Sequence, residues 1–187
     1  VTDAPLVKLA APKRSSQRAG NASTSDGLGK YNTRSGGAVP SLGSLTIPVI
    51  MVNFSDVKFQ PDMNQDKLSR FFNQEGYNED NTFERGSVRD YFLAQSRGLF
   101  NPTFDVVANV TLDHDYAYYG ANSHGSDGRA MTMVKEAVAK AVAQGVDFSQ
   151  YKTTEGNVPN VTIYYAGCGE ATGGDENTIW PHERDLS

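Results

Sequence analysis

Histidine is the side chain best suited to proton transfer near neutral pH and to zinc binding, and this sequence contains three: His114, His124 and His182. A zinc site built on one helix needs two histidines four residues apart, because that spacing places both imidazoles on the same helix face. A glutamate beside the first histidine then serves as the base. No two of the three histidines have that spacing. We therefore predict that this chain alone binds no catalytic zinc ion.

The segment that begins at His182 starts like such a motif but does not complete it. Glu183 follows His182, yet Leu186 stands where the second histidine is required. Pro181 allows at most the first turn of a helix there. A histidine that hydrogen-bonds at the rim of a sheet or lies at the surface is the simpler interpretation. His114 and His124 lie in polar loop segments, where ordinary histidines are far commoner than metal ligands.

Cys168 is the only cysteine of the chain, which excludes an intrachain disulfide and a thiolate zinc cluster. It lies between Gly167 and Gly169, with no base close by in the sequence, and the chain has no Gly-x-Ser-x-Gly elbow. We expect Cys168 to be a small buried apolar side chain rather than a nucleophile.

Carboxylates are denser in the glycine-rich segment that follows Cys168. Glu170, Asp175 and Glu176 lie within seven residues of one another. Oxygen ligands of this kind at the end of a strand can hold calcium. A solvated loop is the alternative, and the sequence leaves both interpretations open.

The composition excludes several classes of protein. Hydrophobic residues make up 38% and charged residues 21% of the 187 residues, as in globular chains. The formal net charge is -5, whereas nucleic-acid binding depends on clustered Lys and Arg, so nucleic acid is not an expected partner. No apolar run reaches the roughly 20 residues of a membrane span. The amino terminus lacks a basic segment followed by an apolar stretch, so we treat the chain as mature or trimmed.

The body of the chain shows alternating strand and helix patterns after a polar stretch. Residues 1–43 have neither the strand nor the helix period, which predicts a flexible tail, and residues 44–187 form the body. Short apolar runs predict strands at 45–54, 104–112 and 161–166, and a short rim strand at 177–182. This order favours an α/β fold, with a twisted mixed sheet and backing helices in three layers.

Three helices are predicted between these strands. Asn64 can cap the first, in which Leu68, Phe71 and Phe72 share one face. Ser87 and Asp90 have the spacing of a capping box, which predicts a second helix that ends near Gly98. The third has an apolar stripe that ends before Gly145, formed by Met131, Val134, Val138, Ala141 and Val142.

Several ordered segments carry a family resemblance. They are Ser87-Val88-Arg89-Asp90-Tyr91-Phe92, Gln95-Ser96-Arg97-Gly98, Phe104-Asp105-Val106-Val107, Tyr116-Ala117-Tyr118-Tyr119-Gly120, Asn160 to Gly167, Gly169-Glu170-Ala171 and Thr178-Ile179-Trp180-Pro181-His182. Together these segments resemble the immune inhibitor A-like family of secreted bacterial zinc metallopeptidases. The resemblance covers about residues 45 to 187.

The resemblance implies the amino-terminal subdomain of a metzincin-like catalytic domain, with residues 1–43 joining it to a propeptide. It implies a zinc-dependent endopeptidase whose His-Glu-x-x-His helix follows this segment, so that the chain needs the rest of the catalytic domain for activity. A protein or peptide substrate and secretion are implied too. By the same analogy, Ile179, Trp180 and His182 lie on a rim strand beside which a substrate peptide extends.

Two other functions remain open at this point. One is a non-catalytic secreted domain that keeps the sheet and serves in binding or assembly. The other is a different hydrolase that uses the neighbourhood of His182 and Glu170.

Overall fold

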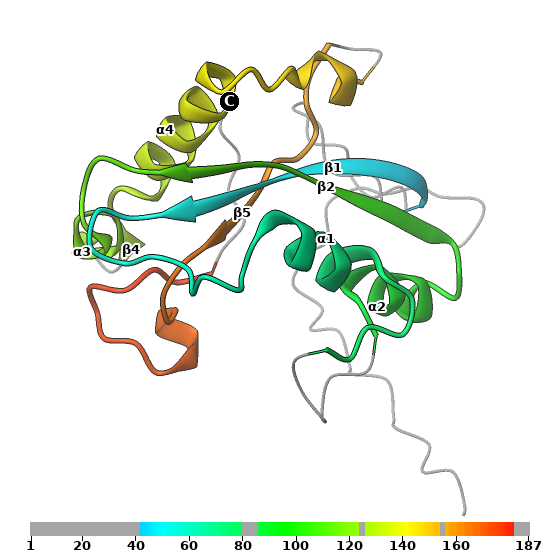
Figure 1. The fold of residues 1–187 in the computed structure, drawn as a ribbon, viewed down its shortest axis with the longest axis horizontal. Coiled ribbons are helices and arrows are strands. Elements are labelled where there is room, and N and C mark those ends of the chain that lie inside the picture. Colours follow the sequence, from blue (N-terminus) through cyan, green and yellow to red (C-terminus); the bar gives the residue numbers. More distant parts are fainter. Residues whose placement is uncertain (1–41, 80–85, 124–125, 154–155, 182–187) are drawn as a thin grey trace, which may run out of the picture. The chain divides into compact units, whose positions relative to one another are not determined.

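A computed structural model of the chain describes residues 42–79, 86–123, 126–153 and 156–181 (Figure 1). The elements follow in this order: β1 (Gly43–Asn53), α1 (Gln65–Asn73), α2 (Val88–Gln95), β2 (Phe100–Thr111), α3 (Tyr116–Gly120), β3 (Asn122–Ser123), β4 (Ser126–Asp127), α4 (Ala130–Ala143), the 3-10 helix η1 (Phe148–Tyr151), β5 (Thr162–Tyr165) and the 3-10 helix η2 (Glu170–Thr172). The predicted tail, residues 1–43, lies outside the described residues except for its last two.

Strand β1 is the centre of a three-stranded sheet with the order β2-β1-β5. All pairings in this sheet are parallel; β1 pairs with β2 along its whole length and with β5 over Val49 to Val52. From Ile47 to Asn53 every residue of β1 is buried. A parallel strand covered on both faces needs such a continuous apolar run, which confirms the strand predicted at 45–54.

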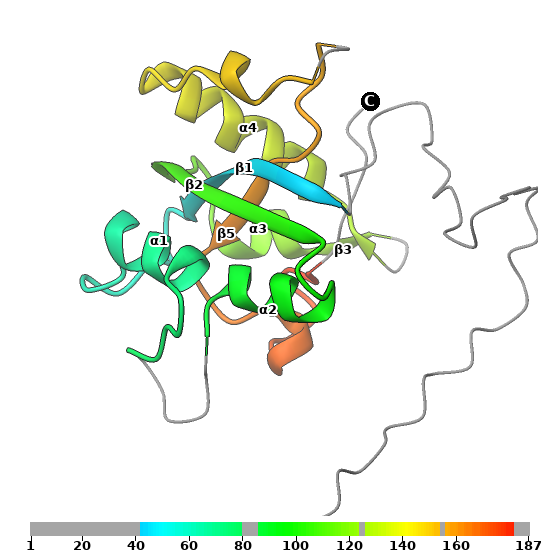
Figure 2. The same ribbon diagram turned by 90° about the vertical axis from the view of Figure 1, so that its right-hand side faces the viewer.

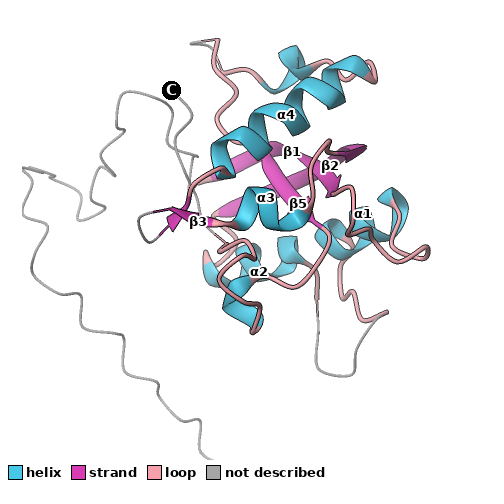
Figure 3. Cartoon of the chain, turned by 90° about the vertical axis from the view of Figure 1, so that its left-hand side faces the viewer, coloured by secondary structure: helices cyan, strands magenta, loops and turns pink. Residues whose placement is uncertain are grey.

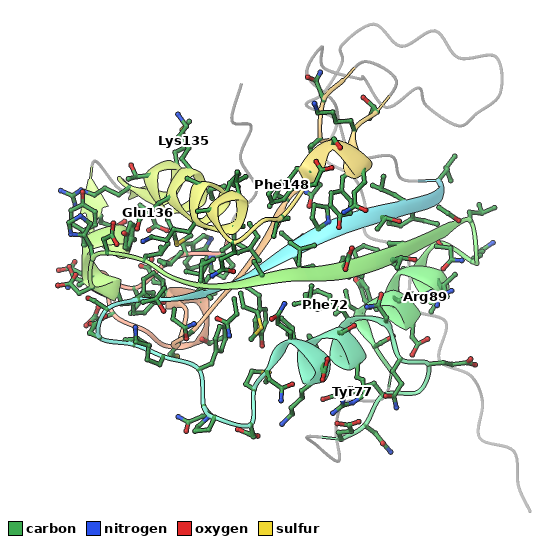
Figure 4. All side chains as sticks on the ribbon, turned by 45° about the horizontal axis from the view of Figure 1, so that its top comes forward. Phe72, Tyr77, Arg89, Lys135, Glu136 and Phe148 are labelled. Carbon is green, nitrogen blue, oxygen red and sulfur yellow. The ribbon has the colours of Figure 1, made fainter. Side chains whose placement is uncertain are left out.

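Helices cover both faces of the sheet, as the three-layer prediction requires (Figure 2). On one face Met51 of β1 packs with Leu68 and Phe72 of α1. On the other face Ile50 and Val52 pack in one cluster with Ala137 and Ala141 of α4. The alternation of side chains along β1 therefore divides the core into two apolar layers. Figure 4 shows Phe72 between α1 and the sheet, and Lys135 directed away from it.

The predicted starts of the first two helices are confirmed. The side-chain oxygen of Asn64 accepts a hydrogen bond from the backbone N–H of Lys67 at 2.9 Å. At α2, Ser87 Oγ accepts from the N–H of Asp90, and Asp90 Oδ2 accepts from the N–H of Ser87 at 2.8 Å. These bonds occupy backbone donors that the first helical turn leaves without a partner.

The buried face of α4 agrees with the predicted stripe only in part: Ala141 belongs to both, and Val138 of the predicted stripe is half-buried against the same cluster. Its buried residues are Ala130, Met133, Ala137 and Ala141, whereas Val142 is 53% exposed. Both sets of residues have helical spacing, so periodicity alone could not choose between them. Small alanine side chains allow the helix backbone to approach the sheet closely, and this packing selects the alanine face.

Other elements also differ from the predictions. Strand β2 begins at Phe100, four residues before the predicted start. The short helices α3, η1 and η2 and the short strands β3 and β4 were not predicted. The rim strand predicted at 177–182 is wrong for its described part, because residues 177–181 form a turn followed by irregular backbone. The α/β fold with backing helices is confirmed, but the predicted mixed sheet is wrong for the described residues: the three-stranded sheet is parallel throughout, and the antiparallel pairing lies in the separate β3–β4 pair. No helix within the described ranges is long and apolar enough to cross a membrane.

Replacing Ser87 by Ala should lower the free energy of unfolding by about 1 kcal/mol, because the capping box loses its side-chain acceptor. Urea unfolding monitored by circular dichroism measures this change. Thr132→Ala, at an exposed position on α4, is the control and should stay within about 0.5 kcal/mol of the wild type. Equal stability of Ser87→Ala and wild type would contradict the role of the cap.

The pH dependence of stability should change when Asp90 is replaced by Asn. The backbone hydrogen bond from Ser87 lowers the pKa of Asp90, so the ionised carboxylate stabilises the folded chain above the pKa of the unfolded state. That stabilisation is lost as the pH falls through the lowered pKa. The stability advantage of wild type over Asp90→Asn should therefore be largest at neutral pH and shrink below about pH 4.

Urea unfolding at a series of pH values from 7 down to 2.5, as a rough range, tests this prediction. Glu75→Gln, which removes an exposed carboxylate, is the matched control and should retain the wild-type dependence. An advantage of wild type that stays constant across the series would contradict it.

Candidate functional site

The candidate site lies at the edge of the sheet where all three parallel strands end. Helix α3 and strand β4 lie at this same edge, and Figure 3 views the molecule from that side. In α/β sheets ligands bind outside the carboxyl ends of the strands. The segments that follow β1, β2 and β5 are therefore the ones to examine for functional side chains.

Helix α3 places the ring of Tyr116 over the end of β1. Asp115 caps the helix by accepting a hydrogen bond from the N–H of Tyr118 at 2.7 Å. Asp56, just after β1, accepts from the N–H of Tyr116 at 2.8 Å. The rings of Tyr116 and Phe54 lie 4.7 Å apart between centroids. These contacts hold Tyr116 in position independently of the segment that follows β5.

Two tyrosine hydroxyls hold the backbone of Ile179 from both sides. The hydroxyl of Tyr116 donates to the carbonyl of Cys168 at 3.0 Å and accepts from the N–H of Ile179 at 3.2 Å. The hydroxyl of Tyr165 donates to the carbonyl of Ile179 at 3.1 Å. Burial raises the pKa of both phenols, so both remain protonated donors at neutral pH.

The next residue, Trp180, is held by its backbone and displays its side chain. Its N–H donates to Oδ2 of Asp127 at 2.9 Å, and Asp127 is a buried residue of β4. The side chain of Ile179 is buried, whereas Trp180 is 52% exposed. The structure thus places two of the three predicted substrate-binding residues side by side at the carboxyl edge. His182 lies outside the described residues.

Glycines allow the segment 174–179 to lie close against the body. A Cβ atom on Gly120, in α3, would lie 2.3 Å from the carbonyl oxygen of Asn177. A Cβ atom on Gly169 would lie 2.8 Å from the hydroxyl of Tyr165. Any larger residue at either position would push the segment away from α3 and β5.

The three predicted calcium ligands are near one another in sequence, but their carboxylates have other surroundings. Glu170 begins η2 and is half-buried, whereas Asp175 and Glu176 are exposed. Asp175 Oδ1 accepts a hydrogen bond from the N–H of Asn177 at 2.8 Å. Within the described part of the chain, no group of three or more His, Cys, Asp and Glu side chains is placed to hold a metal ion. Calcium at this loop stays a prediction.

The described residues do not fit a catalytic zinc ion. His114, the histidine among them, is stacked on Tyr118 with 3.9 Å between ring centroids, and the guanidinium of Arg129 lies 4.5 Å from that same tyrosine ring. His124 and His182 lie outside the described residues. We therefore derive no zinc-dependent step from this part of the chain.

The prediction that Cys168 is buried is wrong. Its side chain is exposed, and its thiol lies 3.2 Å from Oγ1 of Thr172. The preceding Gly167 has φ 107°, which turns the chain outward directly after the buried Ala166.

Sequence reasoning also missed Tyr116, Tyr165 and Asp127 as residues that shape the site. Both tyrosines lie in segments of the family resemblance, yet nothing in the sequence pairs them with Ile179. Asp127 gave no signal, because it lies 53 residues from Trp180 in the chain.

Replacing Gly120 by Ala should lower the free energy of unfolding by about 1 to 3 kcal/mol, because the added methyl group overlaps the backbone of Asn177. Urea unfolding measures the loss. The emission of Trp180, the only tryptophan of the chain, should shift as the segment moves. Ala117→Ser, at an exposed position on the same helix, is the control. Wild-type stability and emission for Gly120→Ala would contradict the close approach.

Comparison with known proteins adds to this geometry. Residues 47–187, more than half of the chain, match the family described as immune inhibitor A peptidase M6, catalytic domain. The pre-pro-metalloprotease PrtV of Vibrio cholerae serotype O1 (strain M66-2) is 24% identical over 149 residues, which cover 69% of this chain and 16% of that protein.

Immune inhibitor A of Bacillus thuringiensis subsp. alesti is 28% identical over 171 residues, which cover 72% of this chain and 24% of that protein. The chain thus spans no more than about a quarter of the length of these relatives. The resemblance noted in the sequence is confirmed: the chain belongs to the immune inhibitor A peptidase M6 family and matches its catalytic domain.

Proposed function

We propose that this chain is the amino-terminal part of the catalytic domain of a secreted, zinc-dependent endopeptidase, with residues 1–43 as a linker to a propeptide. The match of residues 47–187 to an M6 peptidase catalytic domain is the observation on which this rests. One relative is itself named a metalloprotease. The likeness to the amino-terminal subdomain of a metzincin belongs to the same proposal.

In this proposal the chain supplies the surface that receives the peptide, and a His-Glu-x-x-His segment that follows it supplies the zinc chemistry. The described part has no group of His, Cys, Asp and Glu side chains arranged for a metal. It does have a segment at the carboxyl edge of the sheet, Ile179 to Pro181, in which the N–H groups of Ile179 and Trp180 are hydrogen-bonded to other elements. Of the predicted substrate-binding residues Ile179, Trp180 and His182, the last two are the proposed contacts with the peptide, and Ile179, whose side chain is buried, holds the backbone beside them.

Hydrolysis of casein tests the proposal. The protein that contains this chain together with the sequence continuing from it should cleave casein, and a zinc chelator should abolish the cleavage because the bound metal activates the attacking water. The 187-residue chain alone should give no cleavage with or without added zinc.

Two results would contradict the proposal. One is a continuing sequence without a His-Glu-x-x-His motif. The other is cleavage by the 187-residue chain that a chelator does not reduce, which would favour the hydrolase built around His182 and Glu170.

A non-catalytic secreted domain that serves in binding or assembly is the second candidate. The hydrogen-bonded segment from Ile179 to Pro181, with its exposed Trp180, suits that role as well. It predicts a natural gene product that folds as a monodisperse protein, contains no zinc by elemental analysis and cleaves nothing.

A further inference from the structure

The backbone of Ile179 and Trp180 has almost no hydrogen-bonding capacity left for a peptide. The N–H of Ile179 donates to the Tyr116 hydroxyl. The carbonyl of Ile179 already accepts two hydrogen bonds, from the Tyr165 hydroxyl and from the N–H of Glu170 at 3.1 Å. The N–H of Trp180 donates to Asp127.

Residue 181 adds no donor, because it is proline. None of the three residues from Ile179 to Pro181 therefore has an N–H group available to an incoming chain. A peptide that adds to a sheet edge needs both donors and acceptors along that edge, two residues apart. This segment cannot act as such an edge, although its position at the end of the parallel strands suits ligand binding.

A peptide can instead contact the side chain that this backbone displays. Trp180 is 52% exposed at a backbone position that is held by bonds to two neighbouring elements, β4 and, through Ile179, β5. Exposed tryptophan with a fixed backbone loses little conformational entropy when it binds, and its large apolar face favours a large apolar partner.

We propose that Trp180 recognises a large apolar side chain of the substrate peptide through its indole, without backbone pairing by residues 179–181, and that Asp127 is the positioning residue that fixes Trp180. This inference rests on the proposed peptidase function for the identity of the ligand. The position of Asp127 favours the role: it is 5% exposed, and its carboxylate accepts the N–H of Trp180 at 2.9 Å. Hydrogen bonds to a carboxylate are roughly twice as strong as those between neutral groups.

Hydrogen exchange of the Trp180 amide in the 187-residue chain tests the positioning role without any peptide. In wild type this amide should be protected even though its side chain is half exposed. Asp127→Ala should exchange about tenfold faster or more, because the acceptor is lost. Asp127→Asn keeps an acceptor oxygen and should restore most of the protection. Asp147→Ala, which removes the carboxylate that caps η1, is the control and should leave the Trp180 amide unchanged.

Equal acceleration in Asp127→Ala and Asp127→Asn, or none in either, would overturn the role of Asp127. Exchange of the wild-type Trp180 amide at the rate of an unstructured chain would overturn it as well. That measurement needs no variant, so it decides the matter even if Asp127→Ala does not fold.

Binding of fluorescein-labelled hexapeptides, measured by anisotropy on the 187-residue chain, tests the recognition itself. An alanine peptide with one central Phe should bind about tenfold more tightly than the same peptide with Gly, since burial of one large aromatic side chain is worth at least 1.4 kcal/mol. Thioamide replacement of the two peptide carbonyls beside Phe, which weakens them as hydrogen-bond acceptors, should change Kd by less than about twofold, because residues 179–181 have no N–H group left to donate to them.

Trp180→Ala should remove the preference for Phe, and Trp180→Phe should retain most of it. A loss of binding on thioamide replacement would show that a backbone carbonyl of the peptide is recognised and would overturn the inference. Absence of binding by every peptide would overturn the role of Trp180, whereas the proposed function is decided separately by the cleavage of casein. The hydrogen-exchange measurement does not depend on peptide binding. A failure of Trp180 to bind peptides can therefore be distinguished from a failure of the contact between Asp127 and Trp180.

Discussion

Strand β1 is buried from Ile47 to Asn53, so its side chains have to satisfy two apolar layers at once. Met51 faces α1, and Ile50 and Val52 face α4, which requires helices on both sides of the sheet. Strands β2 and β5 pair with the two edges of β1, both in parallel. All three strands therefore end at one edge, and every residue of the candidate site depends on that arrangement.

At this edge the chain leaves regular secondary structure, yet both backbone groups of Ile179 and the N–H of Trp180 have hydrogen-bond partners. The hydroxyls of Tyr116 and Tyr165 and the carboxylate of Asp127 take the place of a neighbouring strand for Ile179 and Trp180. Buried N–H and C=O groups need such partners whether or not the segment belongs to a sheet. The resulting rim is ordered by side chains, which leaves the indole of Trp180, rather than the backbone, to face a ligand.

This arrangement suits a domain that shares peptide binding and chemistry between successive parts of its chain. The described part contains the exposed Trp180 on a hydrogen-bonded backbone and no group of side chains placed to hold a metal, while the chain belongs to a family described as peptidases. A non-catalytic binding domain would use the same rim. The difference between the two functions thus lies in the chemistry that is added to this surface, not in the surface itself.

The sequence by itself determined the elements whose signals are local. The apolar run of β1, the caps at Asn64 and Ser87, and the ordered segments of the family resemblance were all readable, because each depends on residues a few positions apart. Tertiary structure decided which stripe of α4 faces the sheet, since two stripes satisfy the helical period and only packing distinguishes them. It also exposed Cys168, where Gly167 turns the chain outward, and brought Asp127 to Trp180 across 53 residues. The rim could not be read from sequence because its backbone partners are side chains from distant elements, and such contacts leave no local pattern.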